Sequence, residues 1–233
     1  MTASNGSGPN RLERRKARTR AALVGAAQSL LAEGRINVPI LEITQAADVG
    51  MGSFYNHFQS REELFQAAVE EALDRHGALL DLLCEDIEDP AQVFAQSFRL
   101  TGRLHRRHPI LSKVLLNDGL RLANSDRGLA PRARRDIEAA AEAGRFDIHD
   151  PELSMTIVAG AALCLGRLLH DHPERDDAEA ADQVAEDLLR MFGLAPEEAR
   201  EICRRPLPPV DPPRTGNFIA DRSKSHAQQT PNE

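Results

Sequence analysis

The chain has 233 residues, which is enough for one or two domains with a substantial hydrophobic core. Its net charge is −7, so the overall balance does not by itself indicate a nucleic-acid-binding protein. The three cysteines are widely spaced, which excludes a disulfide framework and a zinc module of paired cysteines. Aromatic residues make up only 4 % of the chain, whereas Ala, Leu, Glu and Arg are abundant, and this composition predicts an all-α protein.

Charge is distributed unevenly along the chain. Residues 1–60 contain seven basic and four acidic residues, whereas the remainder contains 22 basic and 32 acidic residues. Six of the seven basic residues lie between positions 11 and 20, in the first predicted helix. This distribution predicts a polyanion-binding head on an acidic body, with Arg15 and Arg18 among the candidates for contacts to backbone phosphates.

The N-terminal part of the sequence predicts short helices joined by tight turns. Residues 1–10 are polar and rich in Gly, Ser and Asn, and we expect them to be disordered. Apolar spacing and breakers then predict helices over 11–33, about 40–47 and roughly 52–58. Gly34 ends the first helix, and Gly50 provides the positive φ for the turn before the third.

A long helix follows this head. Ser60 is the expected N-cap and Glu63 its capping-box partner, which predicts a helix over 61–84. The next predicted helices cover residues 90–107, 110–118, 127–143, 151–169, 177–192 and 196–204. The 151–169 segment is apolar nearly all round and short for a membrane span, so we expect a buried helix there. Residues 206–233 are first rich in Pro and then polar, which predicts a disordered tail.

The three short helices form a helix-turn-helix pattern. The exposed positions of the 52–58 helix are small or hydrogen-bonding, which suits the edges of bases in a major groove. Phe54 and Phe58 are four residues apart and are expected to anchor this helix from below. We therefore expect a DNA-binding helix-turn-helix domain over 11–60 and a helical-bundle domain over 61–205, with helix 61–84 connecting the two.

The segment from Ile43 to Leu64, ITQAADVGMGSFYNHFQSREEL, resembles the signature of TetR/AcrR-type transcriptional regulators. The resemblance covers about residues 11–75 and includes Tyr55-x-x-Phe58, a capped helix with a basic residue at its start, and Glu63-Leu64. It implies that Tyr55 and His57 contact phosphates and that Ser53 and Asn56 also reach bases. The full set of DNA-contacting residues that it implies is Thr44, Gly52, Ser53, Tyr55, Asn56, His57 and Arg61.

The sequence departs from the family pattern at several of these positions. Asp48 stands where the turn usually has Gly, and Gly50 stands where Ser is usual. Met51 occupies a position that is frequently basic, and Arg61 replaces a usual Lys. Val38 occupies the position of the usual Thr cap.

The resemblance also implies a ligand-responsive repressor that binds a quasi-palindromic operator as a homodimer. Helices 151–169 and 177–192 are the expected dimer contacts, because small residues in the first permit close helix approach. The resemblance implies a pocket for a small effector in the body domain. Few charged residues lie on the expected faces, so we expect an apolar or amphipathic effector. The candidate pocket residues are Phe94, Phe98, Leu111, Phe146 and Met155.

Two other functions remain open at this point. Histidines and aspartates of the body, above all His170-Asp171-His172, raise the alternative of a metal-dependent hydrolase. The departures at Gly50 and Met51 raise that of a dimeric ligand-binding protein whose DNA head has decayed. No nucleophile–base motif, P-loop or dinucleotide fingerprint is present, so we expect neither an enzyme nor a cofactor. The polar N-terminus shows no export signal, so we expect a cytoplasmic protein without a membrane partner.

Overall fold

The computed structural model describes residues 11–113, 115–116 and 125–209. All regular secondary structure in these residues is helical, as the composition predicts. The N-terminal segment 1–10 and residues 210–233 of the expected tail lie outside the described residues.

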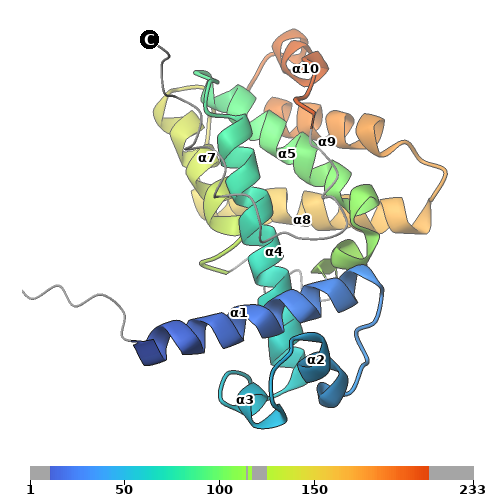
Figure 1. Cartoon of the computed structure of the whole chain (residues 1–233). Coiled ribbons are helices and arrows are strands. Elements are labelled where there is room, and N and C mark those ends of the chain that lie inside the picture. Colours follow the sequence, from blue (N-terminus) through green and yellow to red (C-terminus); the bar gives the residue numbers. More distant parts are fainter. Residues whose placement is uncertain (1–10, 114, 117–124, 210–233) are drawn as a thin grey trace, which may run out of the picture.

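The first three helices form a small head at one end of the molecule (Figure 1). They are α1 (Arg11–Ala32), α2 (Ile40–Ala46) and α3 (Met51–Tyr55). Their apolar sides share one core, in which Leu23, Ile43 and Phe54 are fully buried. The predicted third helix is shorter than expected, because regular helix ends at Tyr55 and Phe58 lies beyond it.

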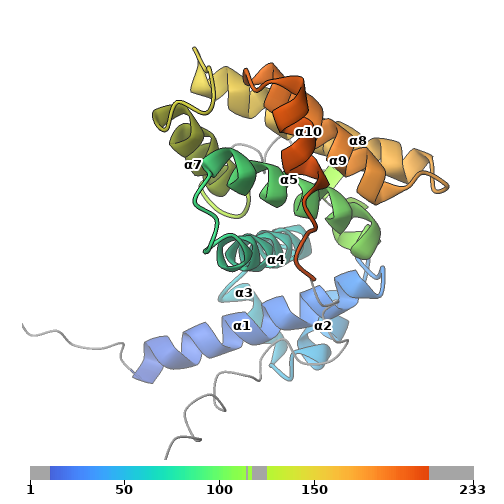
Figure 2. The same ribbon diagram turned by 90° about the horizontal axis from the view of Figure 1, so that it is seen from above.

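Helix α4 (Arg61–Leu83) runs from the head into the body, and Figure 2 shows it nearly end-on between α1 and α5. Ser60 is the N-cap as predicted, because its hydroxyl accepts the Glu63 backbone N–H at 3.1 Å. The return bond of the predicted capping box is displaced by one residue, since the Glu63 carboxylate accepts the N–H of Gln59 at 2.6 Å and not that of Ser60. The first half of α4 buries Leu64, Ala68 and other side chains in the head core. Part of this helix is therefore tied to the head by packing.

The remaining helices build the body. They are α5 (Pro90–Arg107), α7 (Ala130–Glu142), α8 (Pro151–Asp171), α9 (Asp177–Met191) and α10 (Pro196–Arg204). Helix α5 packs against α7, α8 and α9, and the body has a hydrophobic core of its own. Aspartates cap the starts of three of these helices, because a carboxylate accepts an otherwise unpaired backbone N–H there. They are Asp89, Asp150 and Asp176.

Helix α8 corrects one expectation. It is 21 residues long and passes as a possible membrane span by length and composition alone, which for one helix is weak evidence. Only 28 % of its most apolar window is buried. The prediction of a buried helix was wrong: one side of α8 packs in the body, while Leu153, Ile157 and Leu168 are exposed. Helices α5, α7 and α9 pack against α8 but leave one side of it uncovered, so an apolar stripe stays on the surface.

The turn between α2 and α3 also differs from the prediction. Gly50 has a φ of −68°, in the extended region, and directly precedes α3. The residue with positive φ is Asp48, at 52°. Helix α2 ends close to the predicted position, but the residue in the left-handed conformation lies two positions before Gly50 and is an aspartate.

Candidate DNA-binding head and effector cavity

The short helix α3 is held from below by two phenylalanines, as predicted. The Phe54 side chain is fully buried and that of Phe58 is 3 % exposed, and their ring centroids are 6.1 Å apart. The opposite side of α3 faces solvent. Gly52 and Asn56 are exposed, and Tyr55 keeps 60 % of its surface accessible. Ser53 and His57 are half-buried.

Basic side chains of α1 lie beside the end of α3. Arg15 and Arg18 are exposed on α1, and the Arg20 guanidinium lies 5.3 Å from the centre of the Phe58 ring. The pKa of His57 is lowered, first by partial burial and then by the positive charges of Lys16 and Arg20. The surface beside α3 is therefore electropositive, which suits phosphate groups.

Two of the expected DNA-contacting side chains are placed differently. Thr44 is 1 % exposed and its hydroxyl donates a hydrogen bond to the Leu41 carbonyl at 2.9 Å, so its side chain is not open to a duplex. Arg61 is partly accessible, but its guanidinium is paired with the Glu62 carboxylate at 2.8 Å. Thr44 lies four residues after Ile40 and three before Ala47, which both pack against the head core, and its hydroxyl is satisfied within the helix.

A cavity of about 120 Å³ lies in the body beside α4. Phe94, Phe98 and Met155 line it, as proposed from the sequence. The other two candidates do not line it. Leu111 packs against the head core, and Phe146 is stacked on Phe192 with 4.7 Å between ring centroids. Apolar side chains that the sequence analysis missed complete the lining, among them Leu73, Leu80, Leu115, Leu129, Val158 and Leu163.

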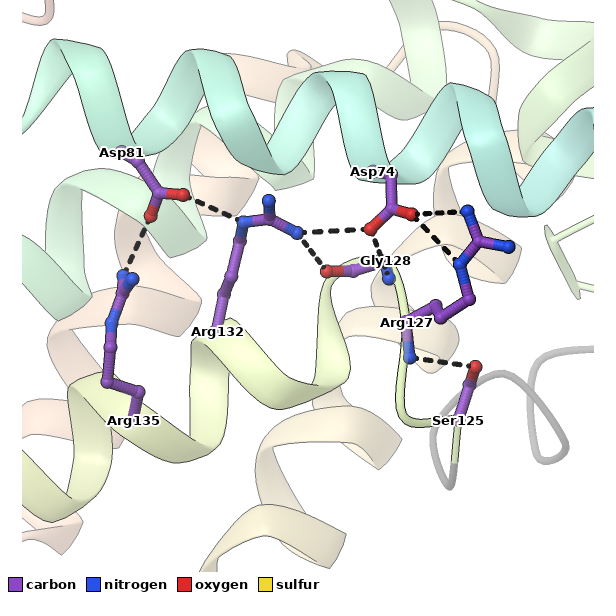
Figure 3. A network of polar contacts seen from close by, with 7 residues as sticks. All are labelled: Asp74, Asp81, Ser125, Arg127, Gly128, Arg132 and Arg135. Carbon is purple, nitrogen blue, oxygen red and sulfur yellow. Dashed lines mark hydrogen bonds and ion pairs between the residues drawn. The ribbon is translucent and has the colours of Figure 1, made fainter. Parts of the chain in front are cut away.

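One wall of this cavity is charged, which the sequence analysis did not foresee. Asp81 from α4 and Arg127, Arg132 and Asp136 from α7 and the turn before it line the cavity. Figure 3 shows how α4 and α7 are joined here: Arg132 reaches Asp81 at 2.9 Å and Asp74 at 3.3 Å. These partners lie about fifty residues apart in the sequence, so no local pattern pairs them.

The carboxylates of this network differ in their protonation behaviour. Burial alone would raise the pKa of Asp74, but hydrogen bonds from the Gly128 N–H, Arg132 and Arg127 outweigh it and lower the pKa. The Asp136 side chain is deeply buried, and burial raises its pKa despite its bond to Arg135 at 2.7 Å. The wall therefore offers hydrogen-bond donors and acceptors to a polar group in the cavity.

A second polar cluster joins the cavity to the helical residues 109–113. His105 lines the cavity, and its Nδ1 lies 2.6 Å from the fully buried Ser112 hydroxyl. The same hydroxyl lies 3.0 Å from Nε2 of His170 on α8. Through these two hydrogen bonds, Ser112 connects its segment to both α5 and α8.

The sequence triplet His170-Asp171-His172 does not form one cluster. His170 contacts Ser112, Asp171 pairs with Arg167 at 2.9 Å, and His172 pairs with Glu174 at 3.3 Å. Among the described residues, no group of three or more His, Cys, Asp or Glu side chains is arranged to hold a metal ion.

Comparisons with known proteins identify both parts of the chain. Residues 22–68 match the model of bacterial regulatory proteins of the tetR family, and residues 89–205 match a tetracyclin repressor-like C-terminal domain. The comparison with curated protein sequences found no match.

Two solved structures of RolR are similar over most of their length. The complex with resorcinol is 35 % identical, with a TM-score of 0.67, covering 84 % of this chain and 98 % of RolR. RolR without ligand is 36 % identical, with a TM-score of 0.66, and the match covers 81 % of this chain and 98 % of RolR. FadR from Bacillus subtilis, in complex with stearoyl-CoA, shares the fold at 13 % identity and a TM-score of 0.55. This match covers 72 % of this chain and 97 % of FadR.

The chain belongs to the TetR family of bacterial transcriptional regulators. It is a DNA-binding, ligand-responsive regulator with a helix-turn-helix head and a helical C-terminal domain.

Proposed function

We propose that this chain is a repressor that binds a quasi-palindromic operator as a homodimer and is released by a small, single-ring aromatic compound with hydroxyl groups. The observation that supports this most directly is the cavity of about 120 Å³ between α4 and the body, apolar except for one charged wall. The head supplies the DNA-binding surface, and α4 connects that head to the cavity.

The size of the cavity favours a small effector. An apolar cavity of about 150 Å³ accepts benzene in another protein, so the volume here suits one aromatic ring and not a long acyl chain. Phe94, Phe98 and Val158 provide apolar contacts to such a ring. The RolR structure with resorcinol, a dihydroxybenzene, supports the same class of ligand.

The charged wall favours a hydroxylated ring over a plain hydrocarbon. A ring hydroxyl can donate to the carboxylate of Asp81 or Asp136 and accept from the guanidinium of Arg132. We propose these three residues as the polar contacts of the effector, with Phe94, Phe98 and Met155 around the ring.

The homodimer is supported by the exposed stripe on α8. Leu153, Ile157 and Leu168 are 56 %, 40 % and 39 % exposed, and Met191 at the end of α9 is 45 % exposed. The first three, with Gly160 and Cys164, recur at helical spacing. We propose that a second copy covers this stripe through α8 and α9, and that the dimer acts in the cytoplasm, where its DNA is.

The central experiment is selection of bound fragments from the source genome, followed by titration of resorcinol into the protein–DNA complex. We expect a palindromic site, salt-sensitive binding and release of the DNA by resorcinol or a related phenol. Tyr55→Ala should abolish binding of the selected DNA fragments, whereas Leu82→Ala, a substitution at an exposed position of α4, should not. A protein that dimerises and binds the phenol but retards no fragment would instead be a ligand-binding protein with a decayed head.

The dimer is tested by Ile157→Arg, which places a charge in the α8 stripe. We expect this variant to sediment as a monomer and to lose most of its operator affinity, while Leu82→Arg remains dimeric. Cys164 offers an independent readout, because it is the one exposed cysteine of the three in the subunit. Its alkylation should be slow in the dimer and fast in Ile157→Arg, and equal rates would contradict an α8 interface.

A further inference from the structure

Met51 is an exposed residue of the head that lies between two glycines. Its side chain is 42 % exposed, and it is flanked by Gly50 and Gly52. At both glycines, no atom lies within 4 Å of the place that a Cβ would occupy. The thioether is therefore the side chain that projects from this run, with open space on either side.

The helices of the head carry exposed polar and positively charged side chains. Exposed Tyr55 and Asn56 on the same short helical segment are hydrogen-bonding groups, and Arg15 and Arg18 are exposed on α1. The positive charges of Lys16 and Arg20 add to burial in lowering the pKa of His57, and the Arg20 guanidinium lies 5.3 Å from the Phe58 ring, so α1 brings positive charge to the end of α3. A duplex is the partner that matches this charge, and Met51 is the exposed aliphatic side chain of α3.

The edges of base pairs present donors and acceptors in the major groove, and their apolar group is the C5-methyl of thymine. A flexible, polarisable thioether makes favourable contact with such a methyl and offers no donor to a phosphate. We infer that Met51 reads a thymine methyl in each half-site and is a specificity-determining residue of this regulator. This inference rests on the proposed function, because it requires that the head binds operator DNA through α3.

The inference makes a prediction about single atoms of the DNA. Replacing the recognised thymine by uracil removes one methyl group and leaves base pairing unchanged. We expect this exchange to weaken binding by the wild-type protein about fourfold per half-site, the factor that corresponds to one buried methyl-sized group. Uracil at the other thymines of the site should have a much smaller effect.

The experiment uses the full chain and duplexes selected from a random-sequence library, each resynthesised with uracil at one thymine at a time. Met51→Ala should bind the thymine duplex about fourfold more weakly per half-site and should not respond to uracil. Met51→Gln keeps the length of the side chain but is polar, and it should also lose the response. Tyr55→Phe is the matched control: it should weaken both duplexes equally and keep the uracil effect.

The possible results distinguish a failure of the thymine contact from a failure of DNA binding itself. Sequence-selective binding with no uracil effect at any position would overturn the thymine contact but leave the regulator in place. A uracil effect that persists in Met51→Ala and Met51→Gln would assign the methyl contact to another residue. Failure to select any duplex would overturn the proposed function, and with it this inference. Circular dichroism of the variants would show that the exposed substitution leaves the fold intact.

Discussion

Asp48 shows how one residue in the turn of the head escaped prediction. Helix α2 ends with the Val49 N–H bonded to the Thr44 carbonyl at 3.0 Å and the Asp48 N–H bonded to the Gln45 carbonyl at 3.1 Å. This is a Schellman motif, in which the residue after the C-cap takes the left-handed conformation. Helices α1, α7 and α9 end in the same way with glycine at that position. In α2 the position is Asp48, whereas the sequence pattern predicts the positive φ at the glycine two residues later.

The left-handed backbone at Asp48 predicts a stabilising substitution. A non-glycine residue in this region costs of the order of 1 kcal/mol, somewhat less for aspartate, and glycine loses more chain entropy on folding. We expect Asp48→Gly to raise the free energy of unfolding by about 0.5 kcal/mol, and Tm by 1–2 °C. Thermal unfolding followed by circular dichroism measures this. Asp48→Ala is the control and should destabilise; if it were as stable as Asp48→Gly, backbone strain would not be the cause.

His57 predicts a pH dependence of DNA binding. Its pKa in the free protein lies below the ordinary value of 6.5, because of burial and the charges of Lys16 and Arg20. A phosphate placed beside the ring would favour the protonated form and raise the pKa, so binding would take up a proton. Affinity should therefore rise as the pH falls from about 8 towards 6.

This dependence can be assigned to one residue by comparison of variants. Fluorescence anisotropy with the selected operator should show a weaker pH response for His57→Gln than for the wild-type protein. His149→Gln, an exposed change in the body, should keep the wild-type response. An unchanged slope in His57→Gln would place the His57 ring away from the phosphates.

At the scale of elements, the helices could be predicted well but their cross-links could not. Apolar spacing, N-caps and breakers place most helix ends within about two residues, as at Pro90–Arg107 and Pro196–Arg204. Phe54 and Phe58 were predicted as anchors because their spacing on a short helix leaves them one inward side. The ion pairs between α4 and α7 join distant segments, and only the packed structure brings Asp74, Asp81 and Arg132 together.

The close approach of Gly77 on α4 to Arg132 on α7 suggests a substitution at Gly77 that displaces the Arg132 side chain without replacing it. Gly77 lies on α4 beneath this side chain, and a Cβ there would come within 2.6–2.7 Å of three Arg132 side-chain atoms. The arginine side chain is flexible, so Gly77→Ala should displace it at little cost in stability. If Arg132 holds a hydroxyl of the effector, phenol affinity should fall about tenfold or more, since a hydrogen bond to a charged group contributes about 1.5–3 kcal/mol.

Calorimetry with resorcinol measures the effect of Gly77→Ala. Ala78→Gly is a suitable control, because it changes the neighbouring, exposed position of the same helix. Operator affinity without effector should be similar in both variants. Undiminished phenol binding by Gly77→Ala would remove Arg132 from the proposed effector contacts.

At the scale of the whole molecule, the head and body have separate cores that meet at the helical residues 109–113 and 115–116. Leu115 belongs to the head core and also lines the cavity, and Ile110 and Leu111 pack against the same core. This explains why Leu111 was misassigned: its apolar character indicates burial but not which core it joins. An effector bound in the cavity, as we propose, would therefore touch a side chain that is packed into the head.

Ser112 is the polar anchor that keeps this segment attached to the body, through His105 and His170. If the segment transmits the effect of the ligand to the head, loosening this anchor should weaken the coupling more than either binding event. We expect Ser112→Ala to bind operator and resorcinol within a few-fold of wild type, but the factor by which resorcinol lowers operator affinity should fall several-fold. Operator titrations with and without saturating resorcinol give this factor.

Ser154→Ala is the control, because it removes another buried serine hydroxyl, one bonded within α8, and should retain full coupling. The same loss in both variants would point to general loosening of the body, and no loss in Ser112→Ala would mean that the signal reaches the head by another path, such as α4 itself.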